Sequence, residues 1–177
     1  TGKGRMVEVS MLEAMAHFAI EPFTAYFALG TVPKAADRPR LAQAHILRTG
    51  DGGLVAIHLS SIEKFWTSLL AGLEAPHLSS DPRFATRLLR IEHYTELGRE
   101  LDKLFSTRTT AEWVAIMSRA DVPFAPINRV DAVVNDPQLQ HLGLMVPIIN
   151  PHTAKQQVRP PVQFDGQRAT GVDPAPL

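Results

Sequence analysis

Three acid–base side chains recur at a four-residue spacing near the N-terminus, namely Glu13, His17 and Glu21. On a helix this spacing places all three on one face. Two carboxylates flanking an imidazole could bind a metal ion or relay a proton. The same spacing is typical of a polar stripe that faces solvent or a partner chain, with Glu13 occupied by the helix cap. We favour the polar stripe and predict no metal site in the chain.

The chain offers few side chains that could act as a nucleophile. It contains no cysteine, which excludes disulfides, a thiolate nucleophile and thiolate metal sites. Ser10 and Ser60 each precede a glutamate by three positions, the pattern in which a hydroxyl caps a helix. Asp37 and Asp51 lie in loop sequences without evident shielding from water, which a covalent acyl intermediate would need. We therefore predict that no catalytic residue lies within this chain.

Charge and hydropathy exclude two classes of partner. The chain has 18 basic and 18 acidic residues and no basic run, so we predict no nucleic-acid binding. Its only long apolar stretch, Met11 to Leu29, carries charged groups and Pro22, which a membrane interior would disfavour. We predict no membrane partner, no signal peptide at the N-terminus and a cytoplasmic location, which the absence of cysteine suits.

Helix-start signals set the frame for these residues. In three segments a hydroxyl residue precedes a glutamate by three positions, which has the form of a capping box. In two others an acid precedes a proline that would occupy the first helical position. The five starts are Ser10–Glu13, Ser60–Glu63, Thr109–Glu112, Asp81–Pro82 and Asp136–Pro137.

These starts and the hydrophobic periodicity predict the order of the elements. We expect a strand at Arg5–Val9 and a helix from Met11 to about Leu29, kinked at Pro22. A glycine-rich turn should join two strands into a hairpin, Ala44–Thr49 with Leu54–Leu59. The remaining predictions are helices from Ile62, over Ile91–Phe105 and over Thr110–Ala120, a strand at Phe124–Ile127, short helices near Val130 and Pro137, and a stop at Gly143.

This order predicts an α+β fold related to an α/β parent. It consists of a small mixed domain with a hairpin and several helices, flanked by a long apolar helix and an extended C-terminal linker. Prolines concentrated toward the C-terminal third favour irregular, extended chain there.

A series of short motifs gives the sequence a family resemblance. No motif is specific by itself, but together they run in order over nearly the whole chain. They are Thr1-Gly2-Lys3-Gly4-Arg5, Val7 to Ala14, Arg48-Thr49-Gly50-Asp51-Gly52, Phe65-Trp66, Asp81-Pro82-Arg83-Phe84, Arg108 to Trp113, Asp121 to Pro126 and Asp136-Pro137-Gln138. On these motifs the sequence resembles the family III CoA-transferases, which include the formyl-CoA and carnitine-type CoA-transferases and the 2-methylacyl-CoA racemases.

The resemblance implies a division of the chain and a partner. Residues 1–30 would end the N-terminal part of a large nucleotide-binding-like domain, and residues 31–43 would form a linker loop. Residues 44–120 would be the small α+β domain, and residues 121–177 a linker returning toward the large domain. In this family two chains interlock, so we expect a homodimer or an association with the missing N-terminal portion.

The resemblance also implies the chemistry. An aspartate of the family attacks an acyl-CoA thioester, CoA leaves as a thiolate, and an acyl-aspartyl anhydride forms. That aspartate precedes the Thr-Gly-Lys-Gly turn, so it would precede Thr1, and this chain alone should be inactive. Acyl-CoA and a carboxylic acid acceptor are the implied substrates, and no cofactor is expected.

One loop is the candidate contact with acyl-CoA. Residues 35–39 stand where the formyl-CoA transferases have a glycine-rich loop over the acyl group, and the departure from that pattern argues against formyl or oxalate specificity. Arg38 could meet a carboxylate or phosphate bidentately, or it could be an exposed loop arginine. The predicted binding residues are Ala36, Asp37, Arg38, Pro39 and Gln43.

Two alternative functions stay open. The racemases place a catalytic glutamate near the position of Glu63, but Glu63 is displaced by one or two residues, which favours a transferase. A non-catalytic acyl-CoA-binding or oligomerisation module is the second alternative. His45 and His58 match no catalytic position, and we interpret each as a half-buried or surface histidine.

Overall fold

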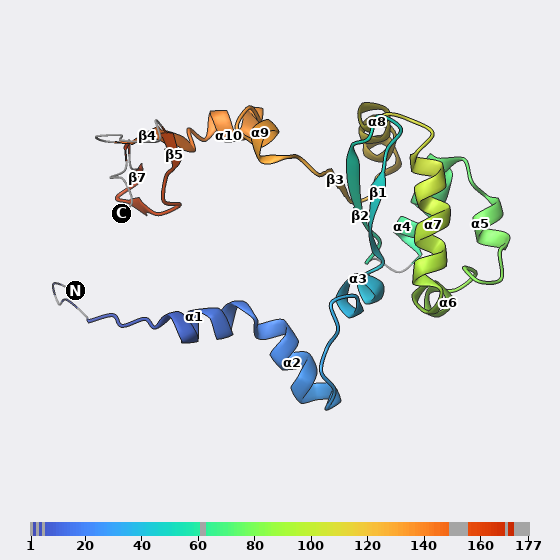
Figure 1. The fold of residues 1–177 in the computed structure, drawn as a ribbon, viewed down its shortest axis with the longest axis horizontal. Helices are drawn as coiled ribbons and strands as arrows, with labels where there is room; N and C mark the ends of the chain where they lie inside the picture. Colours follow the sequence, from blue (N-terminus) through green and yellow to red (C-terminus); the bar gives the residue numbers. More distant parts are fainter. Residues whose placement is uncertain are drawn as a thin grey trace. The chain divides into compact units, whose positions relative to one another are not determined.

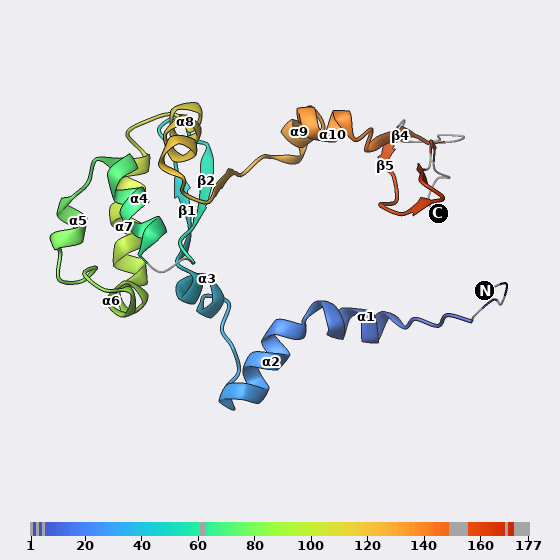
Figure 2. The same ribbon diagram turned by 180° about the vertical axis from the view of Figure 1, so that it is seen from behind.

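The computed structural model describes residues 2, 4, 6–60, 63–148, 156–168 and 170–171. The chain divides into two compact units, Thr1–Ala125 and Pro126–Leu177. Figure 1 shows the ribbon with its elements labelled, and Figure 2 shows the same ribbon from behind.

Three helices open the first unit. They are α1 (Met11–Phe18), α2 (Ile20–Leu29) and α3 (Asp37–Ala42). Ser10 caps α1, since its hydroxyl accepts from the backbone N–H of Glu13. Gly30 ends α2 at a φ of 67°, a left-handed conformation that glycine adopts without strain.

Two predictions for this segment are wrong. The predicted strand is absent from residues 6–9, the described part of its span, because no described strand pairs with them and a lone strand leaves its backbone groups unsatisfied. The single helix kinked at Pro22 is two helices, and the break lies at Ala19 (φ −88°, ψ 24°). Pro22 sits in the first turn of α2, where a missing N–H removes no helical hydrogen bond.

The hairpin forms as predicted and gains a third strand. Strand β1 (Ala44–Arg48) pairs antiparallel with β2 (Leu54–His58), with Ala44 opposite His58. Strand β3 (Phe124–Pro126) completes the sheet in the order β1-β2-β3. Alternate residues of β1 and β2 are buried, so one face of the sheet packs on the core. Figures 1 and 2 show α4 and α7 on that side of the hairpin.

The hairpin turn is fastened to the start of α8. The carboxylate of Asp51 accepts hydrogen bonds from two threonines. One comes from the hydroxyl of Thr49 (2.6 Å), and two come from Thr110, through its hydroxyl (2.9 Å) and its backbone N–H (3.1 Å). These hydrogen bonds, that from Thr49 foremost, lower the pKa of Asp51 to about 2. The backbone N–H of Gly50 donates to the carbonyl of Arg108 (2.7 Å). The Arg-Thr-Gly-Asp-Gly motif therefore holds the β1–β2 turn against the loop that leads into α8.

Five helices follow the hairpin: α4 (Lys64–Leu73), α5 (His77–Ser80), α6 (Arg87–Glu92), α7 (Tyr94–Phe105) and α8 (Thr110–Ala120). The predicted bounds of α8 are confirmed, and Thr109 and Glu112 form the predicted capping box. The predicted helix over Ile91–Phe105 begins at Tyr94. The non-helical backbone of His93 separates it from α6, to which the residues just before His93 belong.

Two predicted helix starts are wrong. Asp81 accepts from the backbone N–H of Arg83 (2.9 Å) in a turn, and the cap of α6 is Thr86. No capping box opens α4: the helix begins at Lys64, and Glu63 before it has a φ of 50°. Ile62, the predicted start, lies outside the described residues.

The core of the first unit is aliphatic and aromatic. Phe105 and Trp113 stack with their ring centroids 4.5 Å apart, and the indole N–H of Trp113 donates to the carbonyl of Phe105 (2.7 Å). Around this pair lie side chains that are at most 2% exposed: Leu47, Val55, Ile57, Leu69, Phe84, Leu97, Leu101 and Met117.

The second unit is built from short elements. They are α9 (Val130–Val133), α10 (Pro137–His141), and the strand pairs β4 (Met145–Pro147) with β5 (Gln156–Val158) and β6 (Gln163–Phe164) with β7 (Gln167–Arg168). The predicted start at Asp136 is confirmed, since its carboxylate accepts from two N–H groups of α10. The predicted stop at Gly143 is also confirmed, with a φ of 60°. Arg159, buried, donates to the carbonyl of Leu142.

Candidate functional site

Helices α1 and α2 expose apolar side chains that a folded chain normally covers. Neither helix contains a buried residue. Met11, Phe18 and Phe27 are 87%, 85% and 78% exposed. Soluble monomers rarely leave so large an apolar surface open, so this surface favours contact with other protein. No helix within the described ranges is both long enough and apolar enough to cross a bilayer.

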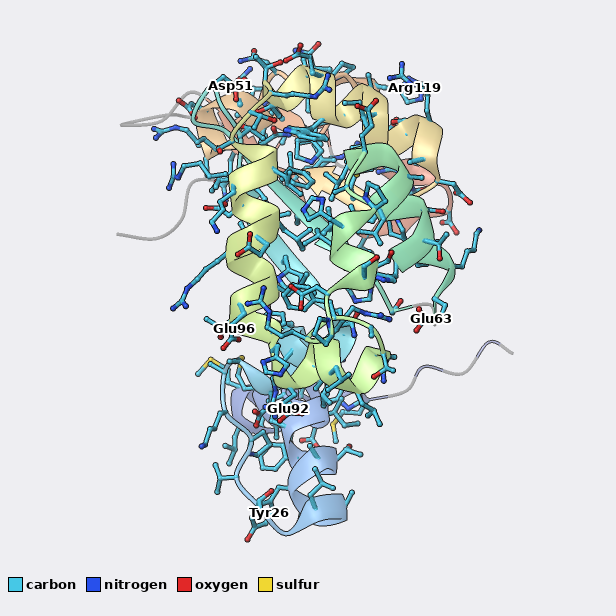
Figure 3. The ribbon with its side chains drawn as sticks, turned by 90° about the vertical axis from the view of Figure 1, so that its right-hand side faces the viewer. Tyr26, Asp51, Glu63, Glu92, Glu96 and Arg119 are labelled. Carbon is cyan, nitrogen blue, oxygen red and sulfur yellow. The ribbon has the colours of Figure 1, made fainter. Side chains whose placement is uncertain are left out.

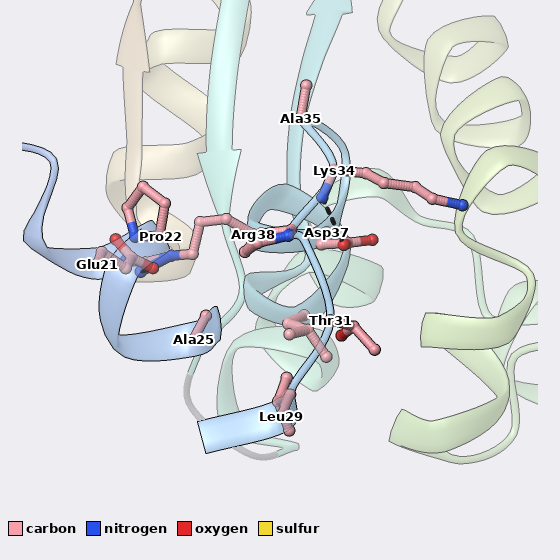
Figure 4. Close-up of a pocket in the computed structure, with 11 residues that line it drawn as sticks. Glu21, Pro22, Ala25, Leu29, Thr31, Lys34, Ala35, Asp37 and Arg38 are labelled. Carbon is pink, nitrogen blue, oxygen red and sulfur yellow. Dashed lines mark hydrogen bonds and ion pairs between the residues drawn. The ribbon is translucent and has the colours of Figure 1, made fainter. Parts of the chain in front are cut away.

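A cavity of about 360 Å³ lies between α2 and the segment that leads into α3. Its walls are mainly aliphatic, from Pro22, Ala25, Leu29, Pro33 and Leu41. Figure 4 shows the residues that line it, with α2 on one side and α3 on the other. Ligand sites are concave and mostly apolar, with a few polar groups that fix orientation, and this cavity has that form.

Four charged residues stand at the cavity, and their charges cancel. The Arg38 guanidinium pairs with Glu21, and Figure 4 shows its side chain extended toward Glu21 beside Pro22. The Asp37 carboxylate accepts from the backbone N–H of Lys34 (2.8 Å). At 64% and 59% exposure the Arg38–Glu21 pair contributes about 0–1 kcal/mol, so it holds the two side chains together only weakly.

The five predicted binding residues fall into three places. Asp37 and Arg38 line the cavity. Ala36 and Pro39 belong to the cap and first turn of α3 but are not among its lining residues. Gln43 is 1% exposed, outside the cavity, with its amide hydrogen-bonded to protein groups. The structure therefore joins Gln43 to the core rather than to the cavity.

A buried arginine organises the other side of α3. Arg90, 1% exposed, donates to the side chain of Gln43 (3.3 Å), to the carbonyl of Phe84 (3.0 Å) and to the carboxylate of Glu63 (2.8 Å). Its guanidinium also lies over the ring of Trp66 at 4.7 Å. We call Gln43, Glu63, Phe84 and Arg90 the Arg90 cluster.

Sequence reasoning missed this cluster. Arg90 stands in the apolar run Leu88-Leu89-Arg90-Ile91, and a lone arginine there was the only available signal. Its partners come from three separate segments, which no local pattern connects. Figure 3 shows Glu63 well apart from Asp51, so the partner of Arg90 and the hairpin turn lie at different places in the first unit.

His45 is buried, which corrects its interpretation as a half-buried or surface residue. It is 4% exposed, stacks on Tyr94 with centroids 4.4 Å apart, and its Nε2 has no hydrogen-bond partner in the described part of the chain. Burial lowers the pKa of His45 to about 4, so the imidazole is neutral at pH 7. His58 is half-buried, as predicted.

The acid–base stripe at the N-terminus does not assemble. Glu13 bonds to the hydroxyl of Ser10, Glu21 pairs with Arg38, and the break at Ala19 separates α1, which carries Glu13 and His17, from α2. Within the described ranges no group of three or more histidine, aspartate or glutamate residues could hold a metal ion.

Comparison with known proteins gives one consistent result. The family model described as CoA-transferase family III matches residues 1–177. The human succinyl-CoA:glutarate CoA-transferase is 27% identical over 183 residues, which cover 100% of this chain and 41% of the human protein. An acyl-CoA transferase of Fusarium pseudograminearum is 28% identical over 180 residues, covering 99% of this chain and 39% of the fungal protein.

Solved structures agree with these matches. The crystal structure of a CAIB/BAIF family protein from Brucella suis superposes with a TM-score of 0.74 at 26% identity, covering 99% of this chain and 46% of that one. The chain spans about two fifths of the length of the curated relatives that it matches.

Proposed function

Because this chain belongs to CoA-transferase family III, we propose that it is a portion of an acyl-CoA transferase that moves CoA between two carboxylic acids. The match of the family model over the whole chain is the observation that carries the proposal. The names of two relatives, succinyl-CoA:glutarate CoA-transferase and acyl-CoA transferase, support the same class of reaction.

The nucleophile of this proposal is an aspartate outside residues 1–177. It attacks the thioester carbonyl, the carbon–sulfur bond breaks, and CoA leaves as a thiolate while an acyl-aspartyl anhydride forms. The acceptor carboxylate then attacks the aspartyl carbonyl of the anhydride and releases the donor acid as a carboxylate. The CoA thiolate attacks the acceptor's carbonyl in the new anhydride, which forms the new thioester and frees the aspartate. Asp51 does not suit the role, because its carboxylate is engaged by Thr49 and Thr110.

The cavity between α2 and α3 is the proposed contact with the acyl group. Its aliphatic walls suit a short carbon chain, and Arg38 can exchange Glu21 for a free carboxylate at the far end of that chain. Acyl groups of short dicarboxylic acids fit this pattern, and so do the substrates in the human relative's name. Formyl or oxalyl groups would leave the aliphatic walls without contacts.

The exposed surface of α1 and α2 is the proposed contact with the rest of the enzyme, in the missing N-terminal portion or in a second copy. Their apolar side chains, exposed here, would be buried there. Residues 44–120 act as the small domain in this proposal, and residues 121–177 as the linker toward the large domain.

The racemase alternative is weakened by the position of Glu63. Its carboxylate accepts from the buried guanidinium of Arg90 at 2.8 Å. Removing this carboxylate would leave the buried Arg90 without its only anionic partner among the described residues, so the ion pair gives Glu63 a structural role.

The test is to express the chain with and without an N-terminal portion carrying the aspartate, and to measure CoA transfer from succinyl-CoA to glutarate. We expect transfer from the assembled protein, none from residues 1–177 alone, and none after aspartate-to-asparagine replacement, which should leave association intact. Transfer by residues 1–177 alone would refute the assignment of roles, and association without transfer would favour the non-catalytic module.

A matched pair of variants tests the cavity in the same assay. Arg38→Met should raise the KM for succinyl-CoA about tenfold and leave that for butyryl-CoA, which lacks the second carboxylate, unchanged. Arg40→Met, two residues along on α3 and outside the cavity lining, is the control. An equal rise of KM for both donors in Arg38→Met would show that Arg38 does not recognise the second carboxylate.

A further inference from the structure

Helix α3 has little of its own to hold it in place. It has six residues, none of them buried, and a helix of this length is unstable in isolation. It nevertheless carries Asp37 and Arg38 at the cavity. Some other part of the chain must fix its position.

Helix α6 supplies three hydrogen bonds to the C-terminal end of α3. Arg87 donates through Nη2 to the carbonyl of Leu41 (2.8 Å), one of the carbonyls that a helix end leaves without an internal partner. The side-chain amide of Gln43, the residue after α3, donates to the carbonyl of Arg87 (3.3 Å). Its oxygen accepts from Nε of Arg90 (3.3 Å).

The anchor beneath these bonds is rigid. Arg90 is buried over Trp66 and is also bonded to Phe84 and Glu63, so its guanidinium has little freedom to move. Gln43 and Glu63 both have a positive φ, of 49° and 50°, and both bond to this one guanidinium. Non-glycine residues keep such conformations only where surrounding contacts over-determine them, and such strain gathers at functional sites.

We infer that Arg87 and Arg90 are positioning residues that fix α3, and thereby place Arg38 at the cavity. This inference rests on the proposed function of the cavity. Neither arginine lines the cavity, so both act through α3 and not by touching substrate. Gln43, which directly follows α3, is hydrogen-bonded to both arginines and so connects them to the helix.

The main test changes Arg87 in the assembled transferase, because loss of the buried Arg90 could unfold the small domain. Arg87→Met should raise the KM for succinyl-CoA about tenfold while kcat changes much less, since a misplaced Arg38 weakens binding. Arg87→Lys, which can still donate to Leu41, should restore most of the affinity. Arg119→Met, an exposed arginine on α8, is the matched control and should leave KM unchanged.

Hydrogen exchange gives a second readout that does not depend on activity. The backbone amides of residues 37–42 should exchange faster in Arg87→Met. They should also exchange faster in Gln43→Gly, which removes the two side-chain hydrogen bonds of Gln43, while glycine adopts the left-handed backbone there without strain. The amides of α7 should not change in either variant.

Unchanged KM in Arg87→Met would overturn the inference, and so would unchanged exchange in α3. If the wild-type assembly transfers no CoA, the proposed function fails, and the exchange measurement alone then decides whether α6 holds α3.

Discussion

Two parts of the first unit contrast sharply in what holds them. Every member of the buried hydrophobic cluster falls between Leu47 and Val122, within the hairpin and the helices around it. The helices before the hairpin, α1 to α3, contain no buried residue although α1 and α2 are rich in apolar side chains. Apolar composition alone therefore does not make a core.

The difference lies in geometry. The hairpin offers one face to α4 and α7, so apolar side chains from several directions exclude water together. Helices α1 and α2 follow one another with a break at Ala19, and neither buries a residue against the part of the chain that the structure describes. The hairpin and helices α4 to α8 bury their own apolar side chains, whereas those of α1 and α2 stay exposed.

The largest expected effect comes from two matched phenylalanine truncations. Phe105→Ala should destabilise the chain by about 3–5 kcal/mol, because it empties a fully buried site against Trp113. Phe18→Ala, at an 85% exposed position, should change stability by about 0.5 kcal/mol or less. Urea unfolding followed by tryptophan fluorescence measures both. Similar losses in the two variants would break the contrast.

The second effect is a pH dependence that arises from His45 on strand β1. His45 keeps a pKa of about 4 when folded, whereas an unfolded histidine titrates near 6.5. Below pH 6.5 the unfolded state therefore binds a proton that the folded state refuses, and stability falls by about 3 kcal/mol between pH 6.5 and 4. Above pH 6.5 this group contributes no slope.

His45→Phe should remove that slope, since the ring stays apolar and uncharged. His58→Phe, on the neighbouring strand, is the control and should keep it. Urea midpoints taken between pH 7 and 5 stay above the range where Asp51, with its lowered pKa, loses its charge. A slope that persists in His45→Phe would show that another group causes it.

The smallest effect concerns two glycines. A Cβ on Gly50 would lie 2.7 Å from the carbonyl oxygen of Ser106, so Gly50→Ala should lower the free energy of unfolding of the hairpin and its helices by about 2 kcal/mol. Gly30, at the end of α2, tests the region before the hairpin. Its φ is 67°, and a Cβ added there would have no atom within 4 Å. Gly30→Ala should strain only the end of α2 and leave the unfolding midpoint of the hairpin and its helices unchanged. A shared loss would mean that the two regions unfold together.

The success of the sequence predictions follows the range of the interactions. Helix α8 was predicted to the residue, because Thr109 and Glu112 cap it from within three positions. The start of α4 was missed, because Glu63 bonds to Arg90, 27 residues away, instead of closing a capping box. The break at Ala19 was missed as well, since proline is the stronger local signal and Pro22 fits the first turn of α2.

The candidate site divides in the same way. Asp37 and Arg38 were singled out from a loop position in a resembling family, and both line the cavity, although their binding of acyl-CoA stays a prediction. Gln43 was placed with them by sequence proximity, yet it faces the core. A residue six positions from Asp37 can face either way, and only the packing of α6 decides which.

Local patterns along the chain were enough to predict the hairpin, α8, the caps at Ser10 and Asp136, the lack of any cysteine chemistry and the order of motifs that marks the family. Each rests on residues close together or on their order along the chain. The tertiary structure alone decided that Arg90 is buried, that Gln43 joins α3 to α6, that His45 is enclosed and neutral, and that the apolar surface of α1 and α2 is left open. These depend on which segments meet in space, and burial and pKa follow from that meeting rather than from local pattern.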